Sequence, residues 1–147
     1  MNLIIVGAGE VGTYLARILA EEGHQITVID SSESACEEAN KLDVFVVNGN
    51  GSSTSALEEA GIAKADFFIS VTNLDEVNML SCMTAKKLGN PITIAGMRDS
   101  TYSDENFKLT EEDLSLIHIS EPTSRYAISY AVFSLKIKRG GGGGGGG

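Results

Sequence analysis

Residues 3–12 read LIIVGAGEVG, an apolar run followed by Gly7, Gly9 and Gly12. The apolar run predicts a β-strand, and the glycines predict a tight turn that leads into a helix from about Glu10. Gly7 allows the turn backbone angles that are closed to other residues. Because Gly9 has no side chain, a pyrophosphate can approach the backbone there, and Gly12 lets the helix lie close to the strand. The first N–H groups of such a helix have no partner within it, so they favour an anion.

The segment that follows the glycines supports a nucleotide-binding interpretation. Apolar residues repeat at helical spacing through residues 11–19, and Gly23 stands where a C-terminal cap belongs. The next run, QITVID, predicts a second strand that ends in Asp30. A carboxylate at this tip, roughly 20 residues past the glycines, is placed to accept hydrogen bonds from both ribose hydroxyls of an adenosine. Because it would repel a 2′-phosphate, NAD or an unmodified adenine nucleotide is favoured over NADP.

Both parts of this signal also have purely structural explanations. Glycine turns occur without any ligand, and Asp30 is suited to cap the following helix, although Ser31 or Ser32 can take that place. Strand, turn, helix and acidic tip together favour nucleotide binding. The candidate cofactor-binding residues of these two segments are Gly7, Ala8, Gly9, Glu10, Val11, Gly12, Asp30 and Ser31.

The remainder of residues 1–113 repeats the alternation of strand and helix. The apolar runs DVFVVN, DFFISV and PITIAGM predict three more strands, separated by amphipathic stretches. Such a pattern indicates an α/β fold with a Rossmann-like, doubly wound parallel sheet, here with about five of its usual six strands. Ligands of this fold lie across the carboxyl ends of the strands. Further candidate binding residues at these ends are Asn50, Gly51, Ser52, Thr72, Asn73 and Arg98.

Charge is unevenly distributed along the 147 residues, whose formal net charge is −9. Residues 1–113 carry −12 and residues 114–147 carry +3. The acidic part argues against binding to the phosphate backbone of a nucleic acid. No run approaches the roughly 18 apolar residues of a membrane span, and no basic and apolar signal region precedes the first strand. We therefore expect a cytoplasmic protein.

Few residues of the chain suggest metal binding or catalysis. Cys36 and Cys82 fall on separate predicted helices, so we expect free buried thiols rather than a disulfide or a metal pair. His24 and His118 have no second ligand nearby in the sequence, so neither a metal site nor a catalytic residue is predicted. The helix that contains Cys82 is expected to turn inward Val77, Leu80, Ser81, Thr84 and Leu88.

Residues 114–147 break the alternating pattern. LSLIHISEPT is what CTG TCT CTT ATA CAC ATC TCC GAG CCC ACG encodes, which resembles a transposase-type sequencing adapter. ISYAVF further on resembles the translated outer adapter, and residues 140–147 are all glycine. We therefore expect residues 114–147 to be a non-native, adapter-derived tail. Residues 1–113 would then be a domain truncated at its C-terminal end, with apolar surface exposed at the edge of the sheet.

Six motifs of residues 1–113 resemble the start of the TrkA family, the N-terminal nucleotide-binding domain also called RCK or KTN. They are GAGEVG, VID, NGNGSS, EAGIAKAD, VTNLDEVNML and MRDSTY, and the VTNLDEVN segment is the most specific of them. The resemblance implies a regulatory subunit of potassium uptake that binds NAD(H), or ATP/ADP. It also implies a homo-oligomer that docks on a membrane potassium-translocating subunit of the TrkH, TrkG or KtrB kind, without entering the membrane itself.

The resemblance assigns roles by position. The three glycines would face the phosphates, Asp30 the ribose, and residues 50–52 the adenosine side. Thr72 and Asn73 would line the pocket, and Arg98 would reach toward the ligand or a neighbouring subunit. The chain departs from the family pattern at two positions, since Asn50 replaces a common acidic residue and Gly96 a frequent arginine.

The mechanism implied is binding without turnover, in which the nucleotide shifts paired domains between arrangements and so biases the membrane subunit. One alternative is the N-terminal half of an NAD-dependent dehydrogenase, because such enzymes share GAGEVG and VID. Another is the same kind of sensing domain attached to an antiporter or a potassium channel. The VTNLDEVN segment favours the regulator over the dehydrogenase.

Overall fold

The computed structural model describes residues 1–96 and 117–120. The strands are β1 (Asn2–Val6), β2 (Gln25–Asp30), β3 (Phe45–Asn48), β4 (Phe67–Ser70), β5 (Ile92–Gly96) and β6 (Ile117–Ser120). The helices are α1 (Glu10–Glu21), α2 (Glu33–Ala39), α3 (Thr54–Glu59), the short 3-10 helix η1 (Ile62–Lys64) and α4 (Asp75–Leu88). The five strands predicted within residues 1–113 are all present, each at its expected place in the sequence.

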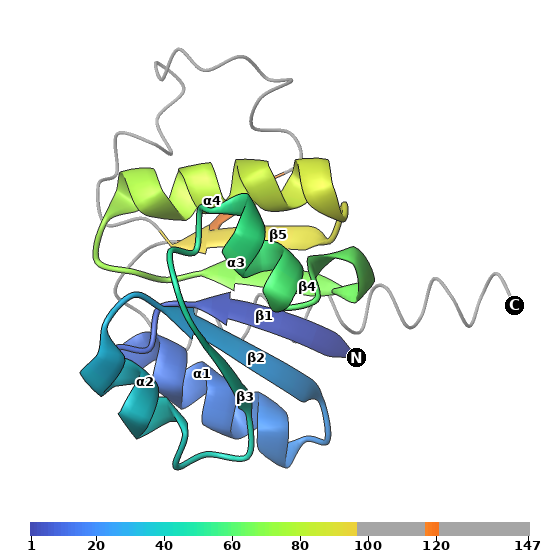
Figure 1. Ribbon diagram of the computed structural model, residues 1–147. Helices are drawn as coiled ribbons and strands as arrows, with labels where there is room; N and C mark the ends of the chain where they lie inside the picture. Colours follow the sequence, from blue (N-terminus) through green and yellow to red (C-terminus); the bar gives the residue numbers. More distant parts are fainter. Residues whose placement is uncertain (97–116, 121–147) are drawn as a thin grey trace, which may run out of the picture.

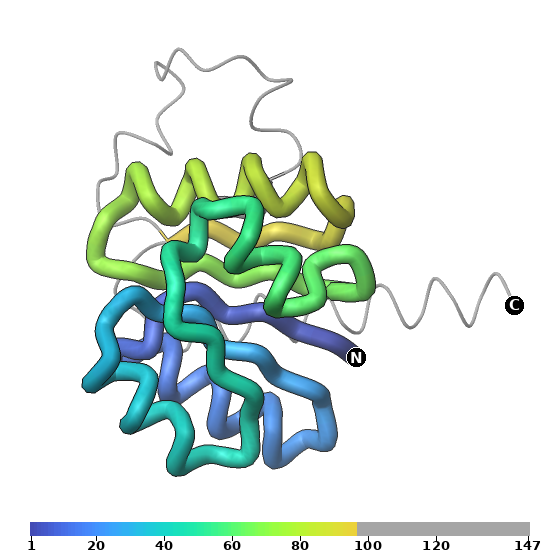
Figure 2. Tube along the Cα trace, viewed as in Figure 1, coloured from blue at the N-terminus to red at the C-terminus, as the bar shows by residue number. Residues whose placement is uncertain are grey.

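The strands form one parallel sheet in the order β3-β2-β1-β4-β5-β6 (Figure 1). After β3 the chain crosses the sheet toward α3 and returns in β4, which lies on the other side of β1 (Figure 2). The strand order therefore reverses between β1 and β4, and in open α/β sheets the crevice at such a reversal is where ligands bind. The predicted fold class, Rossmann-like and doubly wound, is confirmed.

Helices cover both faces of the sheet and make two separate apolar cores (Figure 1). On one face, α1 and α2 pack on the strands through Leu15, Ala16, Leu19 and Ala39. On the other face, α3, η1 and α4 contribute Leu57, Ile62, Met79, Cys82 and Ala85. Burial of the strands on both faces explains why their sequences are continuous apolar runs.

The glycine turn between β1 and α1 is closely packed. Gly7 has a φ of +107°, a conformation that L side chains rarely adopt, and its N–H donates to the carbonyl of Ile29 at 2.8 Å. Gly12 is buried in the first turn of α1 and lies directly against the carbonyl of Gly7. The turn thus fixes where the N-terminus of α1 points relative to the ends of β1 and β2.

The inward face of α4 differs from the one expected from the sequence. Its buried residues are Asp75, Asn78, Met79, Ser81, Cys82 and Ala85, whereas Leu80 is 53% exposed. Of the predicted inward residues, only Ser81 is fully buried. The physical reason is tertiary packing: the small side chains of Ser81, Cys82 and Ala85 are buried against the rest of the protein, and buried Asn78 bonds to backbone carbonyls there.

A sixth strand lies where the sequence analysis expected an open edge. β6 pairs in parallel with β5, with Ile94 opposite His118, and it comes from the segment 114–147 that the analysis set aside. An isoleucine at every second position suits a strand, and the edge of β5 offers unpaired N–H and C=O groups to pair with.

Among the residues that the structure describes, none of the helices is long and apolar enough to cross a membrane.

Candidate functional site

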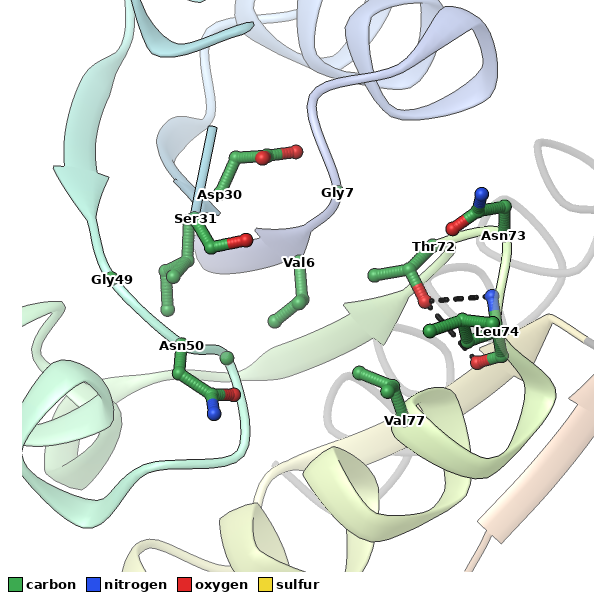
Figure 3. Close-up of a pocket in the computed structure, with 12 residues that line it drawn as sticks. Val6, Gly7, Asp30, Ser31, Gly49, Asn50, Thr72, Asn73, Leu74 and Val77 are labelled. Atoms are coloured by element: carbon green, nitrogen blue, oxygen red, sulfur yellow. Dashed lines mark hydrogen bonds between the residues drawn. The ribbon is translucent and has the colours of Figure 1, made fainter. Parts of the chain in front are cut away.

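A pocket of about 300 Å³ opens at the carboxyl edge of the sheet, beside the point where the strand order reverses (Figure 3). Its walls come from the ends of β1 and β2, the loops after β3 and β4, and the start of α4. The lining residues are Val6, Gly7, Ile29, Asp30, Ser31, Gly49, Asn50, Gly51, Thr72, Asn73, Leu74 and Val77. This volume lies at the low end of the roughly 300–1,000 Å³ of small-molecule sites.

Asp30 stands at the tip of β2 and holds two backbone segments together. One carboxylate oxygen accepts the N–H of Ala8 at 2.7 Å, and the other accepts the N–H of Ser32 at 2.8 Å. Each carboxylate oxygen offers about two lone-pair directions, so each keeps capacity for a further donor such as a ribose hydroxyl. The helix α2 is capped instead by the Ser32 side chain, which accepts from the N–H of Ala35. The alternative role of Asp30 as that helix cap is therefore wrong.

Gly9 is the N-cap of α1 and is exposed. Its φ of −78° is open to any residue, and a Cβ built on it would meet nothing within 4 Å. The fold itself therefore has no steric need for glycine at this position. A methyl group there would, however, project from the positive end of α1, where backbone N–H groups favour an anion.

The loop after β3 forms the opposite side of the pocket. The side-chain carbonyl of Asn50 accepts from the Ser52 N–H at 2.9 Å and from the Ser52 hydroxyl at 2.7 Å. These are bonds that a carboxylate would accept equally well. Asparagine therefore forms this turn without adding a negative charge to the pocket rim.

The pocket has polar and apolar parts. Polar side chains line it at Asp30, Ser31 and Asn50, and again in the loop after β4, whereas Val6 and Val77 face the space from β1 and α4 (Figure 3). A nucleotide has the same division, since its ribose and phosphates are polar and the faces of its rings are not. The residues present therefore fit such a ligand.

The predicted binding residues fall into three groups. Those that line the pocket are Gly7, Asp30, Ser31, Asn50, Gly51, Thr72 and Asn73. Those that lie beside it in the turn, in α1 and in the loop after β3 are Ala8, Gly9, Glu10, Val11, Gly12 and Ser52. Of these, Val11 packs against a hydrophobic core rather than toward the pocket. Arg98 lies outside the described residues.

Sequence reasoning missed the apolar side of the pocket and one buried residue. Leu74 and Val77 line the pocket from the loop after β4 and from α4. Asn78, which is 1% exposed, bonds to the same loop. All three belong to the VTNLDEVN segment, residues 71–78, which the sequence already marked as specific. The spacing of these residues does not, however, distinguish a side chain that lines the pocket from one that packs in the core.

Both cysteines are buried and free in the structure. Burial raises the pKa of the Cys36 thiol, and the negative charge of Asp30 raises it further. Burial raises the pKa of Cys82 to about 12. Both thiols are thus neutral near pH 7, a state in which cysteine is a poor nucleophile. Among residues 1–96 and 117–120, no three His, Cys, Asp or Glu side chains are grouped so as to hold a metal ion.

The parallel sheet, the glycine turn and the pocket at the reversal of strand order define a domain of the Rossmann-like nucleotide-binding class. The sequence profile of one family within this class, the TrkA-N domain, matches residues 3–113. The chain belongs to the TrkA-N domain family.

Relatives with this domain include proteins named for potassium uptake. The chain is 37% identical over 131 residues to a Trk system potassium uptake protein TrkA homolog of Methanothermobacter thermautotrophicus. The aligned segment covers 88% of this chain and 58% of that relative. It is 40% identical over 125 residues to the Trk system potassium uptake protein TrkA of Haemophilus influenzae. Here the aligned segment covers 83% of this chain and 27% of that relative. The chain thus spans from about a quarter to somewhat over half of these relatives.

Solved structures with the same fold are more distant in sequence. A GsuK channel bound to NAD has a TM-score of 0.61 at 20% identity, over 69% of this chain and 18% of that one. The Shewanella denitrificans Kef C-terminal domain in an AMP-bound form has a TM-score of 0.63 at 20% identity, over 93% and 81%. Synechocystis arogenate dehydrogenase has a TM-score of 0.60 at 18% identity, over 83% and 41%. At these identities the likeness concerns the fold alone.

Proposed function

We propose that this chain is the nucleotide-binding part of a regulator of potassium uptake. The observation that carries the nucleotide site is Gly9, a glycine that the fold does not require, at the positive end of α1 and beside the pocket. A residue without a side chain is useful there if a ligand lies against the backbone. Candidate ligands are NAD(H) first and ATP or ADP second. The GsuK channel bound to NAD and the Kef C-terminal domain in its AMP-bound form share this fold.

The regulatory part of the proposal is supported by the relatives. Sequences 37% and 40% identical to this chain are named Trk potassium uptake proteins. In the proposed mechanism the domain binds a nucleotide without turning it over. The bound nucleotide favours one arrangement of paired domains, and that preference biases a membrane potassium-translocating subunit. The protein would then be a homo-oligomer in the cytoplasm, held at the inner face of the membrane by its partner.

Titration of the chain with NADH, NADPH, ADP and ATP tests the nucleotide site. We expect NADH to bind at least about tenfold more tightly than NADPH, because the 2′-phosphate would meet the Asp30 carboxylate and like charges in contact cost several kcal/mol. Isothermal titration calorimetry gives the dissociation constants. In Asp30→Ala the preference for NADH should largely disappear. Absence of binding by all four ligands, or a preference for NADPH, would overturn the proposed site.

Exchange of the domain into a relative tests the link to potassium. Residues 3–113 of this chain would replace the matching segment of the Haemophilus influenzae protein. The chimera would be produced in cells that lack the native regulator. We expect potassium uptake to be restored, because the nucleotide site and the contacts to the rest of the protein would both be present. The same chimera with Gly9→Val should be produced in equal amount but restore no uptake. A stable chimera that restores none without that change would contradict the potassium role.

A further inference from the structure

Asn78 joins the pocket wall to two neighbouring strands. It lies on α4 and is 1% exposed. Its side-chain oxygen accepts from the Thr72 N–H at 2.8 Å, the Thr72 hydroxyl at 2.7 Å and the Ser70 hydroxyl at 3.1 Å. Its NH₂ group donates to the carbonyls of Thr72 at 3.1 Å and Gly96 at 2.7 Å. One buried side chain thus connects the end of β4, the loop that follows it and the end of β5.

These partners fix the orientation of the Asn78 amide. The carbonyls of Thr72 and Gly96 can only accept, so the NH₂ group must face them, and the Thr72 N–H can only donate, so the oxygen must face it. An aspartate would keep the accepting side and lose the donating side. An alanine would leave buried donors and acceptors without partners, which is the costly case for hydrogen bonds.

The consequence for the pocket lies in Thr72. Both its N–H and its hydroxyl are directed to Asn78, and the hydroxyl oxygen also lies within 3.3 Å of the Leu74 N–H. Figure 3 shows this oxygen turned toward Leu74 and the other branch of the side chain turned toward Val6. Thr72 therefore presents its methyl group to the pocket. Together with Val6 and Val77, that methyl group makes the apolar wall opposite Asp30.

We propose that Asn78 is a positioning residue for nucleotide binding: it holds Thr72 so that the threonine methyl group completes an apolar wall for a flat ring of the ligand. The only broad apolar surfaces of an adenine or nicotinamide nucleotide are the faces of its rings, and this wall is the apolar side of the pocket. The inference rests on the proposed nucleotide site and adds a residue that does not line the pocket at all.

The test measures ADP and NADH affinity of the whole chain by titration calorimetry in a set of variants. Asn78→Ala should raise the dissociation constant about tenfold, since it releases the loop and leaves buried groups unpaired. Thr72→Ser keeps the hydrogen bonds but removes the methyl group, and it should raise the dissociation constant about fourfold. In the double variant, Thr72→Ser should add nothing to Asn78→Ala, because the methyl group is no longer held.

A matched control separates positioning from general stability. Met79→Ala removes a buried side chain from the same helix, on the core side of α4. It should lower the melting temperature yet leave the dissociation constants within about twofold. Amide hydrogen exchange supplies a local readout: in Asn78→Ala the Thr72 N–H should lose protection, while the Val71 N–H, bonded to the Val6 carbonyl, should keep it.

Three results would overturn the positioning role while the nucleotide site stands. They are wild-type affinity in Asn78→Ala, an equal loss of affinity in Met79→Ala, and additive losses in the double variant. If Asn78→Ala does not fold, wild-type affinity in Thr72→Ser would overturn it in the same way. If the unaltered chain binds neither ADP nor NADH, the proposed function fails, and the positioning role fails with it.

Discussion

Replacing Gly12 by alanine is expected to lower the free energy of unfolding by at least about 3 kcal/mol. In the interior of a helix, alanine is ordinarily about 1 kcal/mol better than glycine. At Gly12 the added Cβ would lie 1.7 Å from the carbonyl oxygen of Gly7 and 2.8 Å from its carbonyl carbon. Those atoms are backbone and cannot rotate away. The helix must therefore move off the strand, which breaks the contact between α1 and the end of β1.

The measurement is urea unfolding of the Gly12→Ala chain followed by circular dichroism. Gly9→Ala is the matched control, because its Cβ would meet nothing within 4 Å, and its expected cost at the N-cap is no more than about 1 kcal/mol. Equal stabilities of the two variants would mean that α1 does not lie on the turn as described. A much larger loss for Gly12→Ala would show that this glycine is required by packing rather than by a ligand.

Local signals explain how much of the fold could be predicted. The turn at Gly7, the helix that follows it and the strand that ends in Asp30 each depend on residues close together in the sequence. Continuous apolar strands separated by amphipathic helices then leave a doubly wound parallel sheet as the natural arrangement. The same logic placed Asp30, Asn50 and Thr72 at one edge, and the structure brings them around one pocket.

What could not be predicted depends on contacts between distant segments. The side of α4 that faces the sheet is set by tertiary packing, which buries Ser81, Cys82 and Ala85 and leaves Leu80 exposed. The pairing of β6 with β5 joins residues 92–96 to residues 117–120, and no local sequence pattern relates these two segments. The function of Asn78 requires knowledge that the end of β5 comes within 2.7 Å of its side chain. Periodicity contains no information about such distances.

The three glycines of the fingerprint are therefore not equivalent, although the sequence motif treats them alike. Gly7 is required by its backbone angle and Gly12 by the closeness of the Gly7 carbonyl, so both would be needed in a domain that binds nothing. Gly9 has neither constraint. It is the position at which a loss of binding can be separated from a loss of folding.

Substituting Gly9 is accordingly expected to abolish nucleotide binding while the fold survives. A side chain at this N-cap would occupy the space where phosphate oxygens meet the N–H groups of α1, and each lost charge-assisted hydrogen bond costs about 1.5–3 kcal/mol. We expect Gly9→Ala to weaken ADP and NADH binding at least about tenfold, and Gly9→Val to reduce it below detection. The two variants should lose binding in the order of side-chain size.

Calorimetric titration measures that loss, and thermal unfolding of the same samples shows whether the fold is intact. Tyr14→Ala in the middle of α1 is a suitable comparison, since Tyr14 lies one turn beyond the glycine turn and lines no part of the pocket. It should change stability more than affinity, whereas Gly9→Val should do the reverse. Unchanged affinity in Gly9→Val would mean that the phosphates of ADP and NADH do not approach the backbone at the start of α1, and the observation on which the proposed site rests would then fail.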